Sequence, residues 1–265
     1  MLTQDNFSGR VVITLTKTGS NKMEKGYIIY RGKSNLNGKP IVVVALMNGN
    51  KKTGSMIQLY ILVDGIDPRE ANKIGCDDTI CGNCKHKGDV SINPLRKIAE
   101  NRSCYVQLGQ GVLIVYNQML KGAYPDISCS PDKIADLAIG RSVRVGAYGD
   151  GHAVPDYVID CILSKSEGHT AYTHQADHPM VTLRHDIYML SVESLQGAMR
   201  FWEQGYRTFR VLAQGDTLAN NEILCPASKE AGNKVTCNNC LLCAGTSVNA
   251  KSIAIYAHGA GKGNL

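Results

Sequence analysis

The sequence predicts an α/β protein in which a β-rich N-terminal region precedes a partial (β/α) barrel or an open parallel sheet. In the first seventy residues, runs of β-branched residues are separated by turns rich in Gly, Asn and Lys. From about Arg141 onward, strand-like runs alternate with helix-like runs, which is the pattern of βαβ units. A first cluster of cysteines lies between these parts, and a second lies within the later part. We therefore divide the chain into a β-rich region 1–70, a cysteine-rich region 71–135 and a βα-repeat region 136–265.

The N-terminal region is expected to form four strands, because four apolar segments there are rich in Val, Ile, Leu or Tyr. These segments are Val11–Leu15, Tyr27–Tyr30, Ile41–Met47 and Met56–Val63. After the last of them, Asp67 followed by Pro68 has the composition of a helix start, with a capping carboxylate before proline at the first helical position.

The βα-repeat region is expected to alternate strands with helices. The expected strands are Ser142–Tyr148, Thr170–Thr173, Ile187–Val192, Arg207–Leu212 and Ile253–Ala257. Helices are predicted over Pro155–Ser164 and Leu195–Gln204, and Gly205 is a stop signal for the second. This alternation predicts parallel pairing, since strands joined through helices run in the same direction.

Composition and charge exclude few functions. The chain has 265 residues, of which 43% are apolar and 20% charged, an ordinary globular balance. No run approaches the ~20 apolar residues of a membrane span, and the polar start Met1–Arg10 does not resemble a secretory signal, so we expect a cytoplasmic protein. The formal net charge of +6 is compatible with nucleic acid or another anionic partner.

Eight of the ten cysteines fall into two groups of four. The first group is Cys76, Cys81, Cys84 and Cys104, spaced C-x4-C-x2-C-x19-C. The second group is Cys225, Cys237, Cys240 and Cys243, spaced C-x11-C-x2-C-x2-C. Disulfides are not expected in a reducing compartment. Because short spacings let one loop turn several sulfurs toward a common point, the sequence predicts two four-cysteine metal knots.

The spacing bears on which metal is bound. Structural zinc sites commonly take two cysteines from each of two turns, whereas both groups here have three cysteines close together and one remote. The first group has the spacing of plant-type ferredoxins. The second resembles the bacterial arrangement, with Cys225 followed by Pro226, although here this pair precedes the triplet. We therefore favour an iron–sulfur cluster at the second group and leave iron–sulfur and zinc open at the first.

Three further residues, one histidine and the two remaining cysteines, are possible metal ligands or free thiols. His86 could replace Cys104 as a zinc ligand, but its position in the basic run Lys85–Lys87 favours a solvated residue. Cys161 lies in an apolar helical stretch and is expected in the core, and Cys129 lies in a polar stretch and is expected to be a free thiol.

Ionisable residues lie at or near the ends of several expected strands. Ligands of parallel α/β folds bind at the carboxyl ends of strands. Asp150, His174 and Glu193 follow three of these strands and Arg210 lies within a fourth. We predict that these four residues position or protonate a substrate, with His174 suited to acid–base work because imidazole titrates near neutral pH. The alternative is that they cap helices and face water.

Several segments together resemble an uncharacterised family of bacteriophage proteins. The segments are Asn50–Gly54 with Gln58, Cys81–Cys84, Ser103–Val106, Gly146–Asp150, Tyr172–Gln175, Arg207–Arg210, and Cys225-Pro226 with the cysteine triplet. The resemblance implies a phage setting, and hence the cytoplasm of a host cell, without implying a particular reaction.

A remoter similarity is to radical S-adenosylmethionine enzymes, which pair a cysteine-held cluster with a (β/α) barrel. It implies S-adenosylmethionine as a further cofactor, with Cys76, Cys81 and Cys84 as cluster ligands and Cys104 surplus. The usual motif of that superfamily is C-x3-C-x2-C, whereas this chain has C-x4-C-x2-C.

The sequence therefore leaves two functional interpretations open. The first is an iron–sulfur enzyme that performs redox or radical chemistry on an unidentified substrate at the strand ends. The second is a non-catalytic module in which two zinc knots are structural and a basic surface binds nucleic acid or a protein.

Overall fold

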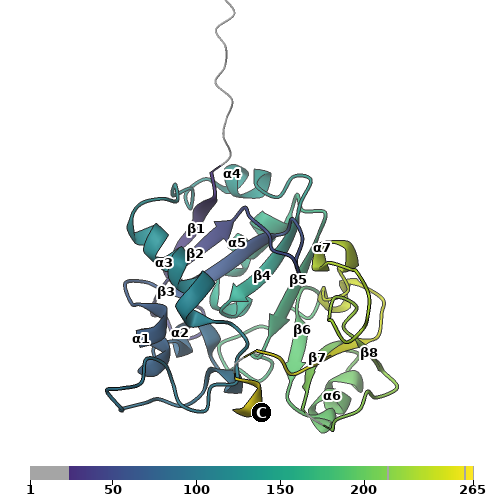
Figure 1. Ribbon diagram of the computed structural model, residues 1–265. Helices are drawn as coiled ribbons and strands as arrows, with labels where there is room; N and C mark the ends of the chain where they lie inside the picture. Colours follow the sequence, from purple (N-terminus) through teal and green to yellow (C-terminus); the bar gives the residue numbers. More distant parts are fainter. Residues whose placement is uncertain (1–23, 214, 260, 265) are drawn as a thin grey trace, which may run out of the picture.

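The computed structural model describes residues 24–213, 215–259 and 261–264. Within these residues the fold is a mixed α/β structure built on one nine-stranded sheet that does not close into a barrel (Figure 1). The strands, in spatial order, are β1 (Gly26–Lys33), β2 (Pro40–Leu46), β3 (Ile57–Val63), β4 (Ser142–Tyr148), β5 (Gly168–Thr173), β6 (Met189–Val192), β7 (Thr208–Leu212), β9 (Ser252–Tyr256) and β8 (Glu222–Leu224).

The sheet changes from antiparallel to parallel at β3. The strands β1, β2 and β3 form an antiparallel meander, and every later neighbouring pair is parallel. Most residues of β2 and β3 are buried on both faces, as their nearly continuous apolar sequences require. The parallel part brings the carboxyl ends of successive strands to one edge of the sheet.

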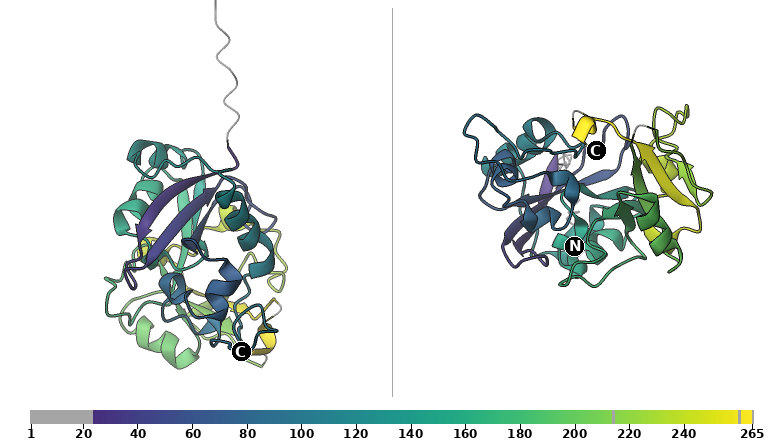
Figure 2. Two further views of the ribbon diagram at one scale, coloured as in Figure 1. Left: turned by 90° about the vertical axis from the view of Figure 1, so that its left-hand side faces the viewer. Right: turned by 90° about the horizontal axis from the view of Figure 1, so that it is seen from below.

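The helices are short and lie around the sheet (Figures 1 and 2). They are α1 (Pro68–Lys73), α2 (Asp78–Cys81), α3 (Leu113–Leu120), α4 (Pro131–Asp136), α5 (Asp156–Leu163), α6 (Leu195–Trp202) and α7 (Cys237–Cys240). None of the helices in the described part of the chain is both long and apolar enough to span a membrane.

Most of the predicted elements are present. The strands expected from Tyr27 onward correspond to β1–β7 and β9, and the carboxylate of Asp67 caps α1 by accepting a hydrogen bond from the Arg69 amide at 2.8 Å. The expected strand Val11–Leu15 lies outside the described residues. The sequence did not reveal β8, which has three residues, or α3, which follows a kinked Gly-containing turn, Leu108–Val112.

Two of the buried apolar clusters divide most of the core between them. The larger is built around β1–β4 and helices α3 and α5, including Ile41, Leu59 and Ile162. The second lies under the C-terminal strands and contains Met189, Ile253 and Ile255 together with two cysteines, Cys225 and Cys243. The proposed regions 1–70 and 136–265 contribute strands to the same sheet, joined by the β3–β4 pairing.

Candidate functional site

A cavity of about 190 Å³ lies against the parallel part of the sheet and is called here the central cavity. Most of the strand residues that line it alternate along β4, β5, β6, β7 and β9, as the two-residue repeat of a β-strand dictates. They are Arg144 and Tyr148 of β4, Thr170 and Tyr172 of β5, Ser191 of β6, Phe209 and Val211 of β7, and Ile255 of β9. One sheet face therefore forms the floor of the cavity.

Both cysteine groups reach this cavity. Three cysteines of the first group line it, Cys81, Cys84 and Cys104, and we call them the first site. All four of the second group line it, Cys225, Cys237, Cys240 and Cys243, and we call them the second site. Cys76 is not among the lining residues, although it packs against the larger apolar core as Cys81 does. Two groups of cysteines that are remote in sequence, Cys81–Cys104 and Cys225–Cys243, thus share one chamber.

The first site is assembled by two hydrogen-bonded connections. The amide of Cys84 donates to the carbonyl of Cys81 at 3.0 Å, which closes the C-x2-C turn. The amide of Cys104 donates to the carbonyl of His86 at 2.9 Å, which brings the remote cysteine beside that turn. The spacing of nineteen residues is therefore compatible with a single site, because the intervening chain loops out and returns.

Gln175 fastens the first site to the sheet. Its amide nitrogen donates to the carbonyl of Cys81 at 2.9 Å, and its amide oxygen accepts from the Asn83 amide at 3.1 Å. Gly82 between them has φ of +47°, and a Cβ there would collide with the Gln175 amide. Glycine is thus required at this position both by its backbone conformation and by the close approach of the glutamine.

Asp150 lies at the carboxyl end of β4 and is buried. Its carboxylate accepts hydrogen bonds from the Gln175 side chain at 3.0 Å, the Thr173 hydroxyl at 3.0 Å and the amides of His174 at 2.9 Å and His152 at 3.1 Å. Burial alone would raise the pKa of Asp150, but the adjacent His152 side chain, together with the Gln175 side chain and the His174 amide, outweighs it, and the pKa lies below the ordinary value. Asp150 lines the cavity as an anion that orients its neighbours.

The second site is held mainly by the main chain. The amides of Cys237 and Asn238, at the start of α7, donate to the carbonyls of Lys52 at 2.9 Å and Thr53 at 3.2 Å. The Cys225 amide donates to the carbonyl of Ala254 in β9 at 2.8 Å. The loop after β2 therefore supports α7, and the C-terminal strands support Cys225.

Burial and mutual proximity set the state of the thiols. Burial raises the pKa of Cys84 and of Cys243 to about 12 each. At Cys243 the other three thiols of the second site raise the pKa further, while a hydrogen bond with Tyr172 lowers it. Burial also raises the pKa of Cys81, with added contributions from Asp77, Cys84 and Cys104. Because burial and neighbouring thiols disfavour the ionised form, these cysteines become thiolates only when positive charge lies nearby, and a metal ion can supply that charge.

The sulfurs are more widely spread than a single zinc ion requires. Four thiolates bound to zinc at ~2.3 Å in a tetrahedron lie roughly 3.8 Å apart. In the part of the chain that the structure describes, three possible ligand atoms come within 4.8 Å of one another only at His86, His174 and Glu193, not at either cysteine site. A cluster with several irons separates its thiolates further than one ion does.

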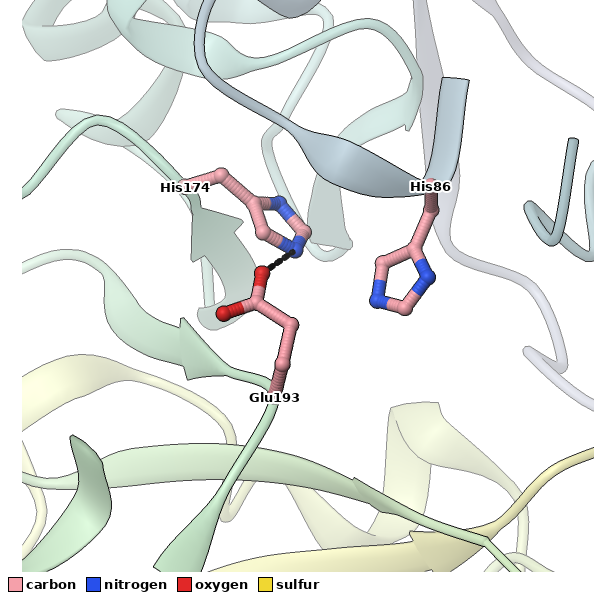
Figure 3. Close-up of side chains that lie close together, drawn as sticks. All are labelled: His86, His174 and Glu193. Atoms are coloured by element: carbon pink, nitrogen blue, oxygen red, sulfur yellow. Dashed lines mark ion pairs between the residues drawn. The ribbon is translucent and has the colours of Figure 1, made fainter. Parts of the chain in front are cut away.

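His86, His174 and Glu193 form a separate polar group beside the first site (Figure 3). His174 follows β5, Glu193 follows β6 and His86 lies in the turn after Cys84. The Nε2 atom of His174 lies 3.8 Å from Oε1 of Glu193, and the two imidazole rings meet edge to face at 5.5 Å. His86 was expected to face solvent; it is half-buried and lines the cavity, because the Cys81–Cys84 turn directs it inward.

Of the predicted catalytic residues, Asp150 and His174 line the cavity, Glu193 does not line it but lies close to His174, and Arg210 is directed away from it. Arg210 alternates with Phe209 and Val211 on β7, so its side chain projects from the opposite face of the sheet. There it forms a buried ion pair with Glu222 of β8, with Nη2 2.6 Å from Oε2.

The remaining cysteines stand apart from the cavity. Cys129 is exposed, and Cys161 is partly buried on α5, where its thiol donates to the carbonyl of Pro131 at 3.0 Å. The C-terminal residues, by contrast, approach the cavity: the Asn264 side chain donates to the carbonyl of Arg102 at 3.1 Å.

Four cationic side chains also line the cavity, Lys52, Lys87, Arg102 and Arg144. Arg144 projects from the floor and donates to the Tyr105 hydroxyl. These charges stand between and beside the two cysteine sites, so the cavity suits an anionic or polar ligand.

Comparisons of the chain with protein-family models, with curated proteins and with solved structures find no match.

Proposed function

We propose that this protein is an iron–sulfur enzyme that performs redox or radical chemistry on a substrate bound in the central cavity. The observation that carries the proposal is that seven cysteines from two remote segments line one chamber on the carboxyl-end side of a parallel sheet. A metal site that only stabilises the fold does not need to face a shared cavity. Two redox centres that act on the same substrate must both face the cavity that binds it.

The wide spread of the sulfurs supports clusters over single zinc ions. Neither cysteine site gathers three ligand atoms within 4.8 Å among the described residues, which fits a multi-iron centre better than one tetrahedral ion. Cys81, Cys84 and Cys104 would hold one cluster and Cys225, Cys237, Cys240 and Cys243 the other. A bound cluster supplies or accepts single electrons.

The two sites support different roles. Four thiolates complete the ligand shell of a four-iron cluster, whereas three leave one iron free to bind a small molecule. With Cys76 outside the cavity, the first site is the one with this vacancy. S-adenosylmethionine, which the resemblance to radical enzymes suggests, is our candidate for that position, and the cationic residues beside it suit its carboxylate. The proposal departs from the resemblance in taking Cys104 and not Cys76 as the third cluster ligand.

The protein's own side chains would organise the substrate. Asp150 fixes the backbone of His174 and so orients the imidazole toward the cavity. While its Nε2 binds no ion, His174 is then available to accept or donate a proton, and Arg144 to bind an anionic group of the substrate. We infer a phage setting, in the cytoplasm of the host, from the resemblance of the segments that converge on this cavity.

Anaerobic purification tests the proposal. The protein should be brown and contain about four to eight irons per chain. Cys81→Ser and Cys237→Ser should each remove about half of the iron, while Cys129→Ser, at an exposed position, should remove none. Under reduction, the wild type should cleave S-adenosylmethionine and Cys81→Ser should not.

Zinc-stabilised binding to nucleic acid or a protein is the second candidate, and the four cations around the cavity favour it. It predicts colourless protein with about two zinc ions per chain and no iron. It also predicts salt-dependent binding of nucleic acid that Arg144→Gln weakens. Such a result would overturn the enzyme proposal.

A further inference from the structure

His86, His174 and Glu193 offer three ligand atoms that all lie within 4.8 Å of one another. In Figure 3 the two rings and the carboxylate border a common space, with His174 and Glu193 joined as an ion pair. The residues come from three separate segments, two of which follow neighbouring parallel strands. Their convergence is thus a product of the tertiary fold.

The separations are close to those of a bound ion. Ligands at ~2.1 Å from an ion lie about 3.4 Å apart across a tetrahedral angle. The Nε2 of His174 and Oε1 of Glu193 are 3.8 Å apart, so small side-chain rotations suffice to close the group. Glu193 is 39% exposed and His174 20%, which leaves an entry route and room for further ligands.

The surroundings already hold both histidines in place. The Nδ1 of His86 is hydrogen-bonded to the Ser103 hydroxyl at 2.8 Å, which leaves Nε2 directed to the group. A metal-binding histidine usually has such a partner on its other nitrogen. The main chain of His174 is held by the buried carboxylate of Asp150 at 2.9 Å.

We propose that His86, His174 and Glu193 bind one divalent first-row transition ion, separate from the ions held by cysteine. Two imidazoles and one carboxylate form a set that binds Fe²⁺, Mn²⁺ or Zn²⁺ and leaves positions open for water or substrate. The site does not depend on the nature of the cysteine centres. Its position between the first site and the strand ends gives the cavity a third centre.

Binding of Mn²⁺ to the anaerobically purified full-length chain tests the proposal, because Mn²⁺ prefers oxygen and nitrogen ligands to thiolates. Titration followed by the loss of the free-ion electron paramagnetic resonance signal should give one bound Mn²⁺ per wild-type chain. Glu193→Gln and His174→Gln should weaken binding by at least the ~10-fold that loss of a supporting residue causes. Glu203→Gln and His185→Gln, at exposed positions outside the group, should bind as the wild type does.

Visible absorbance and circular dichroism, recorded on the same samples, separate this proposal from the proposed function. Unchanged absorbance with lost Mn²⁺ binding supports a separate ion. No binding by the wild type, or equal binding by all variants, would overturn the site. Loss of the cysteine-centred absorbance in Glu193→Gln would overturn it too, since the group would then belong to the first site. Glu193 is the decisive position, because its partial exposure makes a folding defect least expected there.

Discussion

The two cysteine sites share one cavity but are built differently. In the second site, Cys225 and Cys243 are buried within the C-terminal apolar cluster. The cysteines of the first site stand on turns fastened by Gln175, and two histidines lie beside them. The second site also brings four thiols to the cavity, whereas the first brings three.

This difference suggests that the second site stabilises the fold and that the first site carries out the chemistry. Closed ligand shells are typical of structural metal sites, and open ones are typical of catalytic sites. Because the second site is part of a core cluster, its loss should unfold the surrounding strands. Because the first site is attached through side-chain hydrogen bonds, its loss should change chemistry more than stability.

The largest effect is expected for Cys243→Ser. The variant removes a proposed metal ligand and also places a hydroxyl in the C-terminal core, so we expect a loss above about 4 kcal/mol in the free energy of unfolding. Cys84→Ser is the matched variant at the first site and should lose less. Urea unfolding followed by circular dichroism, with metal analysis of each sample, measures both. Equal losses would remove the distinction between the sites.

The next effect concerns the ion pair of Arg210 and Glu222, which anchors β8 directly before Cys225. Both side chains are at most 3% exposed. Arg210→Met would leave a buried carboxylate unpaired and should lower the free energy of unfolding by about 3–5 kcal/mol. The double variant Arg210→Met with Glu222→Leu should recover most of this loss. Failure of the double variant to recover would mean that Arg210 acts by something besides the pair.

Gln175→Ala should have an intermediate effect, confined to the first site. The change removes the hydrogen bonds to Cys81 and Asn83 and the donor to Asp150, and we expect a loss of about 1–3 kcal/mol. The first site should also release its metal faster in air than in the wild type, while the second retains its own. Gln204→Ala, at an exposed position, is the control. A faster release from both sites would show that they are not held independently.

The sequence predicted where most of the strands lie along the chain and which residues stand at their ends, because strand periodicity and turn signals are local. It did not predict which face each side chain would occupy. Arg210 and Asp150 were both expected to act on a substrate. Arg210 lies on the opposite face of the sheet, where it pairs with Glu222. The carboxylate of Asp150 accepts four hydrogen bonds from neighbouring groups of the protein. Strand alternation fixes that Phe209 and Arg210 face opposite ways, but only the packed fold decides which side holds the cavity.

The cysteine spacing predicted which residues could bind metal but did not reveal that both groups share one cavity. That convergence depends on the parallel sheet, which brings segments before β4 and after β8 to the same side. His86 was assigned to solvent because its neighbours are Lys85 and Lys87. Its inward direction comes from the Cys81–Cys84 turn and from the return of Ser103. The cysteine spacing predicts the turn, but no local signal predicts that Ser103 returns beside it.

The smallest effect is expected at Cys76, and it decides how many thiols the first site has. Cys76 is partly buried against the larger core, while Cys104 lines the cavity. Cys76→Ser should therefore retain the wild-type metal content and cost about 1 kcal/mol or less. Cys104→Ser should lose the metal of the first site. Metal analysis of both variants is sufficient.

The opposite outcome at these two positions would have a definite meaning. Loss of metal in Cys76→Ser would require the Gly75–Asp78 turn to move toward the cavity when metal binds, because Cys76 does not reach it now. The first site would then have four thiols and no vacancy for a small molecule. Its chemical difference from the second site would disappear, and the histidine group beside it would remain as the open position in the cavity.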